Sequence, residues 1–199
     1  MPIIRIIKPN DNTIVGIWKI TETLDNLSKS VSLSSTSKEL LKNRKSKVHK
    51  LQFLGVRAIL LELGYSVDSL SYQDNRPILN DNKKISISHS NLFSCVIISD
   101  LKVGIDVQEI NHKINTIAKK FIGYETLYLD VDDFKRMTII WNIKESIYKI
   151  ANINRLDYKT HLLVVPFNLC DNFTYAWLIY KNLKERYASY FFTIENYSF

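Results

Sequence analysis

Two short segments carry side chains that could hold a metal ion and a phosphate group. In the first, Asp106 and Gln108 follow an apolar run that begins at Val103. In the second, Glu145 and Lys149 are four residues apart. Carboxylate and amide oxygens are hard ligands of the kind that Mg²⁺ prefers, and a lysine ammonium can contact phosphate. The two segments together therefore predict chemistry on a metal-bound diphosphate.

The first segment is expected to be a strand at residues 103–108. On a strand, Asp106 and Gln108 project from one face, whereas Val107 and Glu109 point to the other. A strand that simply runs into a polar turn, with no chemical role, has the same pattern. The segment by itself does not separate these two readings.

The second segment is expected to lie on a helix at about residues 132–151. A helix places Asn142, Glu145, Ser146 and Lys149 on one polar stripe, and isoleucines at 143, 147 and 150 on the buried one. The alternative is a surface pair between Glu145 and Lys149, worth only about 0.2–0.5 kcal/mol. Lys144 lies about 100° away from the stripe, so it is a weaker candidate for chemistry.

The order of the motifs resembles a known family. The sequence V-G-I-D at 103–106, followed by W-N-I-K-E-S-I-Y-K at 141–149, is similar to the signature of the 4′-phosphopantetheinyl transferases of the surfactin-synthetase-activating type. The family's first motif reads G-I-D-x-E. This chain has Gln108 at the place of the glutamate, and its own glutamate comes one residue later, at Glu109.

Three upstream segments resemble the same family. The sequence I-S-I-S-H-S at 85–90 is similar to a strand end that contacts coenzyme A, and N-R-P-I-L at 75–79 is similar to a G-K-P-x-L turn. The basic segment K-V-H-K-L-Q-F-L-G-V-R at 47–57 resembles a basic helix that ends with an arginine, here Arg57, which could also be structural. The resemblance covers residues 44–149.

The resemblance implies an α+β fold built from two similar lobes in a pseudo-twofold arrangement. Residues 1–100 would form the N-terminal lobe, with the basic helix and the S-H-S strand end that bind coenzyme A. Residues 101–199 would form the C-terminal lobe, with the metal and catalytic motifs. The active site would lie in the cleft between the lobes.

The resemblance also implies an enzyme that transfers 4′-phosphopantetheine from coenzyme A to a serine of an apo acyl, peptidyl or aryl carrier protein. The reaction would depend on magnesium, with manganese as a possible substitute, and would release adenosine 3′,5′-bisphosphate. Asp106, Glu145 and Gln108 would be the metal ligands. Glu145 would accept the serine proton, and Lys149 would contact the diphosphate. The further residues expected to bind coenzyme A are Lys47, Lys50, Arg76, Ser88 and His89.

Gln108 leaves three outcomes open. A glutamine carbonyl can ligate magnesium but brings no charge, so it predicts weaker metal binding in the absence of substrate. The chain could be a working enzyme in which water or Gln108 fills that place, or an enzyme that needs manganese or a high metal concentration. It could also be a degenerate homologue that binds coenzyme A or a carrier protein without transfer. The sequence favours the first.

Amino-acid composition and net charge narrow the possible classes of protein and of partner further. The 199 residues are 46% hydrophobic and 24% charged, which is typical of a globular protein and excludes a disordered or collagen-like chain. The net charge of +7 predicts acidic partners, such as coenzyme A and an acidic carrier helix. Nucleic acid is the weaker alternative because the charges are spread along the chain and no standard motif is present.

Other expectations concern location and the cysteines. The N-terminus lacks a signal-peptide pattern and no apolar run is long enough to span a membrane, so we expect a cytoplasmic monomer that does not act at a membrane. Cys95 and Cys170 have no metal or disulfide spacing and are both expected to be structural. The carrier is expected to dock near residues 109–133, against Lys119 and Lys120.

Alternating patterns and turn residues predict the remaining elements. Helices are expected at 37–43, 47–63 and 114–121, in addition to 132–151. Strands are expected at 3–8, 14–20, 69–72, 84–88, 93–99, 162–165, 173–180 and 187–195, in addition to 103–108.

Overall fold

The computed structural model describes residues 3–199 as a mixture of helices and antiparallel strands, which confirms the α+β class. The chain divides into two compact units, Met1–Val103 and Gly104–Phe199. These are called the N-terminal unit and the C-terminal unit below, and each has its own hydrophobic core.

The N-terminal unit is built on a four-stranded antiparallel sheet with the order β1-β2-β6-β5. Its long helix, α3 (Lys47–Glu62), packs against β6 and β2. The helix begins where the Ser46 hydroxyl accepts a hydrogen bond from the backbone N–H of His49, and it ends before Gly64, whose φ of 84° suits glycine. The strands are β1 (Ile3–Asn10), β2 (Thr13–Lys19), β5 (Lys84–Ser90) and β6 (Phe93–Ser99).

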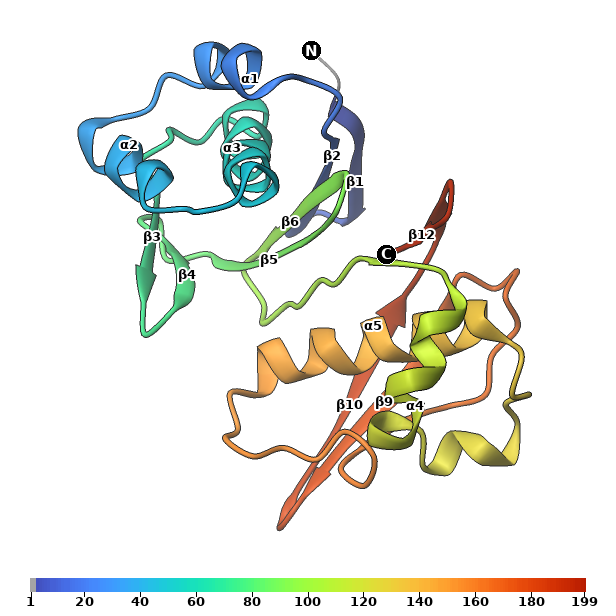
Figure 1. Cartoon of the computed structure of the whole chain (residues 1–199). Helices are drawn as coiled ribbons and strands as arrows, with labels where there is room; N and C mark the ends of the chain where they lie inside the picture. Colours follow the sequence, from blue (N-terminus) through green and yellow to red (C-terminus); the bar gives the residue numbers. More distant parts are fainter. Residues whose placement is uncertain (1–2) are drawn as a thin grey trace. The chain divides into compact units, whose positions relative to one another are not determined.

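Two helices and a hairpin complete this unit (Figure 1). Helix α1 (Leu24–Ser30) was not predicted, and α2 (Ser35–Lys42) lies two residues earlier than expected at its start. The hairpin joins β3 (Leu70–Gln73) to β4 (Arg76–Leu79). Residues 76–79, read from the sequence as a turn, are therefore a strand. The turn is made by Asp74 and Asn75, both with positive φ, as the mirror-image hairpin turns require.

The C-terminal unit has one long helix, α5 (Phe134–Ala151), packed on a three-stranded antiparallel sheet with the order β10-β9-β8. Asp133 caps the helix by accepting a hydrogen bond from the backbone N–H of Arg136 at 2.8 Å. Ile139, Ile143 and Ile147 are buried on the predicted apolar stripe. The strands are β8 (Leu162–Val164), β9 (Phe173–Tyr180) and β10 (Leu183–Tyr190).

A second small sheet, with the order β11-β12-β7, corrects two predicted strands. The strand expected at 103–108 is an extended segment, and only β7 (Gln108–Glu109) is paired. The strand expected at 187–195 is divided between the end of β10 and β11 (Thr193–Ile194), which turns back into β12 (Tyr197–Ser198). The other elements are η1 (His112–Ile114), α4 (Asn115–Phe121) and η2 (Tyr124–Leu127).

Two further observations bear on the sequence expectations. Within residues 3–199, no helix combines the length and the apolar character needed to cross a membrane. Cys95 is completely buried, as a small hydrophobic side chain would be; Cys170 is exposed, and its expected structural role stays a prediction.

Candidate functional site

The two motif segments of the C-terminal unit lie in direct contact because residue 104 is a glycine. A Cβ atom at Gly104 would be 2.1 Å from the backbone oxygen of Ser146, a separation that real Cβ atoms do not show. Gly104 thus lets the extended segment run against the backbone of α5, one residue after Glu145. The motif glycine is needed for this close approach.

Asp106 is held at both carboxylate oxygens. Its side chain is 4% exposed, and Oδ1 accepts a hydrogen bond from Lys149 Nζ at 2.8 Å. The same ammonium donates to the backbone oxygen of Ile105 at 2.6 Å. Gln108 Nε2 donates to Asp106 Oδ2 at 3.0 Å, so Asp106 and Gln108 do lie on one side of the segment, although only Gln108 belongs to a strand. Asp106 is therefore a fixed, buried anion.

Glu145 lies one helical turn before Lys149 and next to this anion. Burial raises the pKa of Glu145, and the nearby negative charge of Asp106 raises it further. A hydrogen bond with Tyr158 and the positive charge of Lys149 offset part of this effect. Glu145 is a carboxylate whose charge the protein itself compensates incompletely, a property typical of proton-transfer and metal-binding groups.

Tyr158 is the functional residue that sequence reasoning missed. It lies in the loop after α5, where burial, followed by the charge of Glu145, raises the pKa of its phenol, so that it remains a neutral hydrogen-bonding partner of Glu145. Its ring contacts Trp141 and Tyr148, with centroid distances of 5.4 and 5.3 Å. Its backbone oxygen accepts a hydrogen bond from Lys144 Nζ at 3.0 Å. One loop residue thus contacts four residues of α5.

Lys144 is part of the buried core, which agrees with the sequence analysis, where it is a weaker candidate for chemistry than Lys149. The side chain is completely buried and forms an ion pair of 2.8 Å with Glu125, which is also completely buried. Its ammonium donates to the backbone oxygen of Phe121 at 2.6 Å as well. Glu125 in turn accepts hydrogen bonds from the backbone N–H groups of Gly123 and Val164. This network fixes the turn of α5 that carries Glu145.

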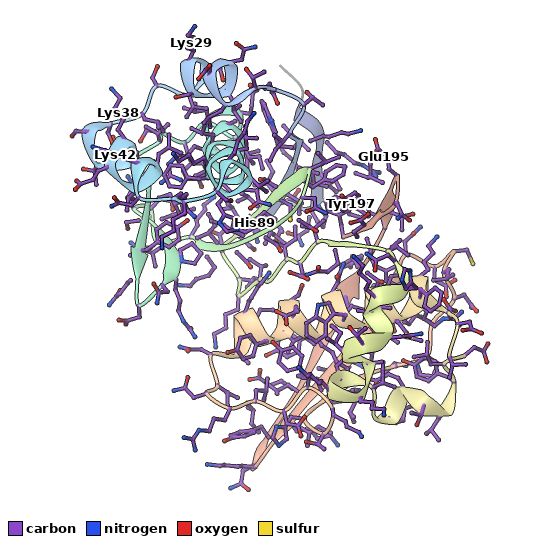
Figure 2. All side chains as sticks on the ribbon, in the orientation of Figure 1. Lys29, Lys38, Lys42, His89, Glu195 and Tyr197 are labelled. Atoms are coloured by element: carbon purple, nitrogen blue, oxygen red, sulfur yellow. The ribbon has the colours of Figure 1, made fainter. Side chains whose placement is uncertain are left out.

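Strand β12 joins the two motif segments through its backbone. Ser198 pairs with Gln108 in the small sheet, and its carbonyl oxygen accepts a hydrogen bond of 2.7 Å from Asn142 Nδ2 of α5. Figure 2 labels the neighbouring Tyr197, which pairs with Glu109. The polar stripe predicted on α5 therefore faces the chain's own backbone at Asn142, which is 4% exposed. No sequence motif indicated this connection.

Three side chains of this group are of the kinds that could hold a magnesium ion. In residues 3–199 no three His, Cys, Asp or Glu side chains gather as ligands, so the candidate set consists of two carboxylates, Asp106 and Glu145, and the amide of Gln108. Magnesium is commonly held by one or two carboxylates together with substrate phosphates and water. The incompletely compensated charge of Glu145 beside Asp106 is what a divalent cation would neutralise. Gln108 presents its NH₂ group to Asp106, so ligation by this residue requires the amide to turn.

The residues expected to bind coenzyme A belong to the N-terminal unit. Lys47 and Lys50 are in the first turn of α3, and Arg76 is the exposed first residue of β4. Ser88 is buried in β5, whereas the next residue, His89, is exposed near the strand's end (Figure 2). These side chains lie on three elements of one unit, and their expected role stays a prediction.

Arg57, the arginine near the middle of α3, is 1% exposed. Its guanidinium lies over the ring of Phe53, 3.4 Å from the centroid, and Nη1 donates to the backbone oxygen of Phe53 at 3.4 Å. Burial lowers the pKa of Arg57 to about 10. It is thus a core residue of the N-terminal unit.

Comparison with known proteins adds no relative: no family model and no curated protein matches this sequence. The structure defines a mixed α+β protein of two units. In the second unit, the buried carboxylate of Asp106 accepts hydrogen bonds from the amide of Gln108 and the ammonium of Lys149.

Proposed function

We propose that this chain is a magnesium-dependent 4′-phosphopantetheinyl transferase with the two-lobed fold of that superfamily. It would transfer phosphopantetheine from coenzyme A to a serine hydroxyl of an apo carrier protein. The observation that carries the proposal is the grouping of Asp106, Glu145 and Lys149 in one unit, with Lys149 bonded to Asp106 at 2.8 Å. These are the residues that the motif resemblance assigns to the reaction.

The two carboxylates have different tasks in this proposal. Asp106 is nearly inaccessible and bonded on both oxygens by side chains of the protein, so it is a fixed anchor for a cation. Glu145 is the group with the raised pKa, which makes it the better proton acceptor near neutral pH. When bound, magnesium supplies positive charge that stabilises the charge developing on the diphosphate.

Proton transfer would then proceed from the carrier serine to Glu145 as the serine oxygen forms a bond to the β-phosphorus of coenzyme A. The bond from that phosphorus to the bridging oxygen breaks, and adenosine 3′,5′-bisphosphate leaves with the electron pair. Lys149 can donate toward the departing phosphate because its side chain remains 27% exposed while its ammonium is bonded to Asp106. Tyr158 positions Glu145 through its hydroxyl and does not itself react.

The first test is the intact mass of an apo carrier protein incubated with this chain, coenzyme A and either magnesium or manganese. A gain of one phosphopantetheine mass is the expected result. No gain with acyl, peptidyl and aryl carriers and with both metals would overturn the proposal.

A variant pair then tests the assignment within the site. Glu145→Gln should abolish transfer while coenzyme A still binds, because its expected contacts are with Lys149 and with residues of the N-terminal unit. Glu39→Gln, on the exposed surface of α2, is the matched control and should keep full activity. Full activity of Glu145→Gln would show that the base is elsewhere.

Two substitutions of Tyr158 test its positioning role through kcat and stability. Tyr158→Phe keeps the ring contacts and removes the hydroxyl that bonds Glu145, so kcat should fall while KM for coenzyme A stays constant. Tyr158→Leu should also loosen the loop and lower stability. Equal kcat for Tyr158→Phe and the parent would exclude a positioning role.

A second candidate, a non-catalytic binding homologue, is favoured by Gln108. Its amide donates to Asp106 where the family carries a third negative charge, so the metal site has two carboxylates. Gln108→Glu separates the two candidates in the same mass assay. The catalytic candidate predicts transfer by the parent, and tighter metal binding for the variant; the binding candidate predicts transfer by neither or by the variant alone.

A further inference from the structure

The sheet of the C-terminal unit has an outer face that is rich in aromatic and basic side chains. Along β9, the buried residues Thr174, Ala176 and Leu178 alternate with residues that point away from α5. The register of β9 with β10 places Arg186 opposite Trp177 and Tyr190 opposite Phe173. We call this surface the aromatic-basic face; its members are Phe173, Tyr175, Trp177, Lys184, Arg186 and Tyr190.

The face is open to solvent. Tyr190 is 67% exposed and Tyr175 is 37% exposed, and Lys184 and Arg186 are exposed as well. In Figure 1, β9 and β10 form the long orange-red hairpin behind α5, and the core of this unit lies on the α5 side of the sheet. Strand β10 is at the edge of that sheet. The aromatic-basic face is thus a large apolar and charged surface outside the candidate active site.

The basic groups are already ordered on the rings. The guanidinium of Arg186 lies over the ring of Tyr175 at 4.5 Å from the centroid, and the ammonium of Lys184 lies over Trp177 at 5.3 Å. Phe173 contacts Tyr175 and Tyr190, with centroid distances of 4.9 and 5.0 Å. A guanidinium that is already ordered against a ring loses less conformational entropy when it pairs with a carboxylate.

These contacts separate two classes of acidic partner. Single-stranded nucleic acid binds such sheets by stacking bases on open aromatic faces. Here the cations of Arg186 and Lys184 already lie over the rings of Tyr175 and Trp177, so one face of each of these two rings is covered. Tyr, Trp and Arg are also the residue types that contribute most binding energy at protein interfaces.

We infer that the aromatic-basic face is a docking surface for an acidic protein segment, one that offers carboxylates to Lys184 and Arg186 and an apolar side chain to Tyr175 and Tyr190. The charge complementarity follows from the two exposed cations of the face, Lys184 and Arg186. The inference does not depend on the transferase proposal, because no residue of the candidate site belongs to this face.

The experiment is a titration of the whole isotope-labelled chain, followed by nuclear magnetic resonance, with a short synthetic peptide of alternating Glu and Leu. The expected result is a shift of the Trp177 indole N–H and of the backbone signals of β9 and β10. Lys184→Glu/Arg186→Glu should weaken the interaction by about tenfold or more, which corresponds to about 1.4 kcal/mol. Lys29→Glu/Lys38→Glu, on α1 and α2 (Figure 2), changes the net charge equally and should leave binding unchanged.

Three results would overturn the inference. The first is a titration without shifts on β9 and β10. The second is an equal response to a peptide of alternating Lys and Leu, which would exclude charge recognition. The third is tighter binding of a short thymidylate single strand than of the acidic peptide, which would assign the face to nucleic acid. Thermal unfolding of both double variants shows whether each one is folded.

Discussion

The long helices of the two units each bury one basic side chain completely. Among the described residues, only Lys144 has a matched environment, by which we mean a carboxylate partner for its charge. Lys144 on α5 has a carboxylate partner and two backbone oxygens around its ammonium. Arg57 on α3 has the ring and one backbone oxygen of Phe53 and the hydroxyl of Tyr72, and its Nε and Nη2 have no hydrogen-bond partner among the described residues. The pKa of each is lowered by burial.

The difference matters for what each helix supports. The pair of Lys144 and Glu125 connects α5 to the turn at η2 and to β8, one residue before Glu145 of the candidate site. Arg57 donates to the backbone of the residue one turn earlier in its own helix and interacts with Tyr72 of β3. The C-terminal unit thus uses a buried charge to fix a site, whereas the N-terminal unit contains one that contributes mainly to packing.

Each helix also has a close approach at a glycine, and these differ in what a side chain would meet. At Gly55 of α3, a Cβ would be 2.9 Å from the hydroxyl oxygen of Ser94, a side chain that can rotate. At Gly104, it would meet the backbone of α5 at Ser146. Only the second contact positions a candidate functional residue.

The largest effect is expected from Glu125→Ala, which removes the matched environment of Lys144. It leaves the ammonium buried without a counter-charge and frees the N–H groups of Gly123 and Val164, so we expect a loss of about 3–5 kcal/mol. Urea unfolding measures the change in the free energy of unfolding. Glu39→Ala on the surface of α2 is the control, and an equally small loss for both variants would contradict a structural role for the pair.

Gly104→Ala should be the next most damaging change. Its methyl group cannot fit against the oxygen of Ser146, so the segment must move away from α5 and separate Asp106 from Lys149; overpacking of this kind costs about 1–3 kcal/mol. Binding of Mn²⁺, followed by electron paramagnetic resonance, should weaken together with stability. Gly55→Ala, the matched change on α3, should leave Mn²⁺ binding intact, and equal Mn²⁺ affinities for the two variants would refute the positioning role of Gly104.

Arg57→Met should have a small effect on stability. It tests the comparison at the buried cation of the N-terminal unit. Methionine fills a similar volume and removes a desolvated charge that has two unpartnered nitrogens, so we expect a change within about 1 kcal/mol. Urea unfolding at neutral pH is the measurement. A loss as large as that of Glu125→Ala would mean that Arg57 is as well matched in the folded protein as Lys144.

The smallest effect is expected from Glu145→Gln in protein kept free of divalent metal. Because the folded state raises the pKa of Glu145, the folded state binds more protons than the unfolded chain between the two pKa values, and stability falls as the pH rises through the folded pKa. Glu145→Gln lacks the free-energy cost of ionising a buried carboxylate in the folded state. It should therefore melt slightly higher than the parent at neutral pH.

The pH dependence is the control for that prediction. Below the unfolded pKa of a glutamate, Glu145 is protonated in both states, so the difference in melting temperature should vanish as the pH falls. Glu39→Gln, at an exposed residue of α2, is the matched surface variant. A difference that is constant with pH would assign the gain to something other than the charge.

Periodicity predicted the parts of this molecule that depend on local pattern. The helices containing Arg57 and Glu145, the central strands and the common side of Asp106 and Gln108 all follow from residue spacing. Residue spacing did not predict that the segment before Gln108 would be extended but unpaired. This segment runs against the backbone of α5 at Gly104 and does not pair with a strand.

The supporting residues of the site were not predictable for a different reason. Tyr158, Glu125 and Ser198 act through contacts with backbone or side chains that are distant along the sequence, in a loop, a short helical turn and a two-residue strand. None of these elements has a period that a sequence pattern can reveal. Lys144 is the instructive case, because its spacing placed it off the polar stripe while its partner could come only from the fold.

The backbone of Ser198 has a consequence for synthesis on the ribosome. It bonds Asn142 and pairs with Gln108, yet it is made long after both. A growing chain that has already formed α5 must wait for this residue to emerge before the two motif segments can be tied together. We expect the candidate site to be completed late in the folding of each new molecule, after the helix that carries Glu145 has formed.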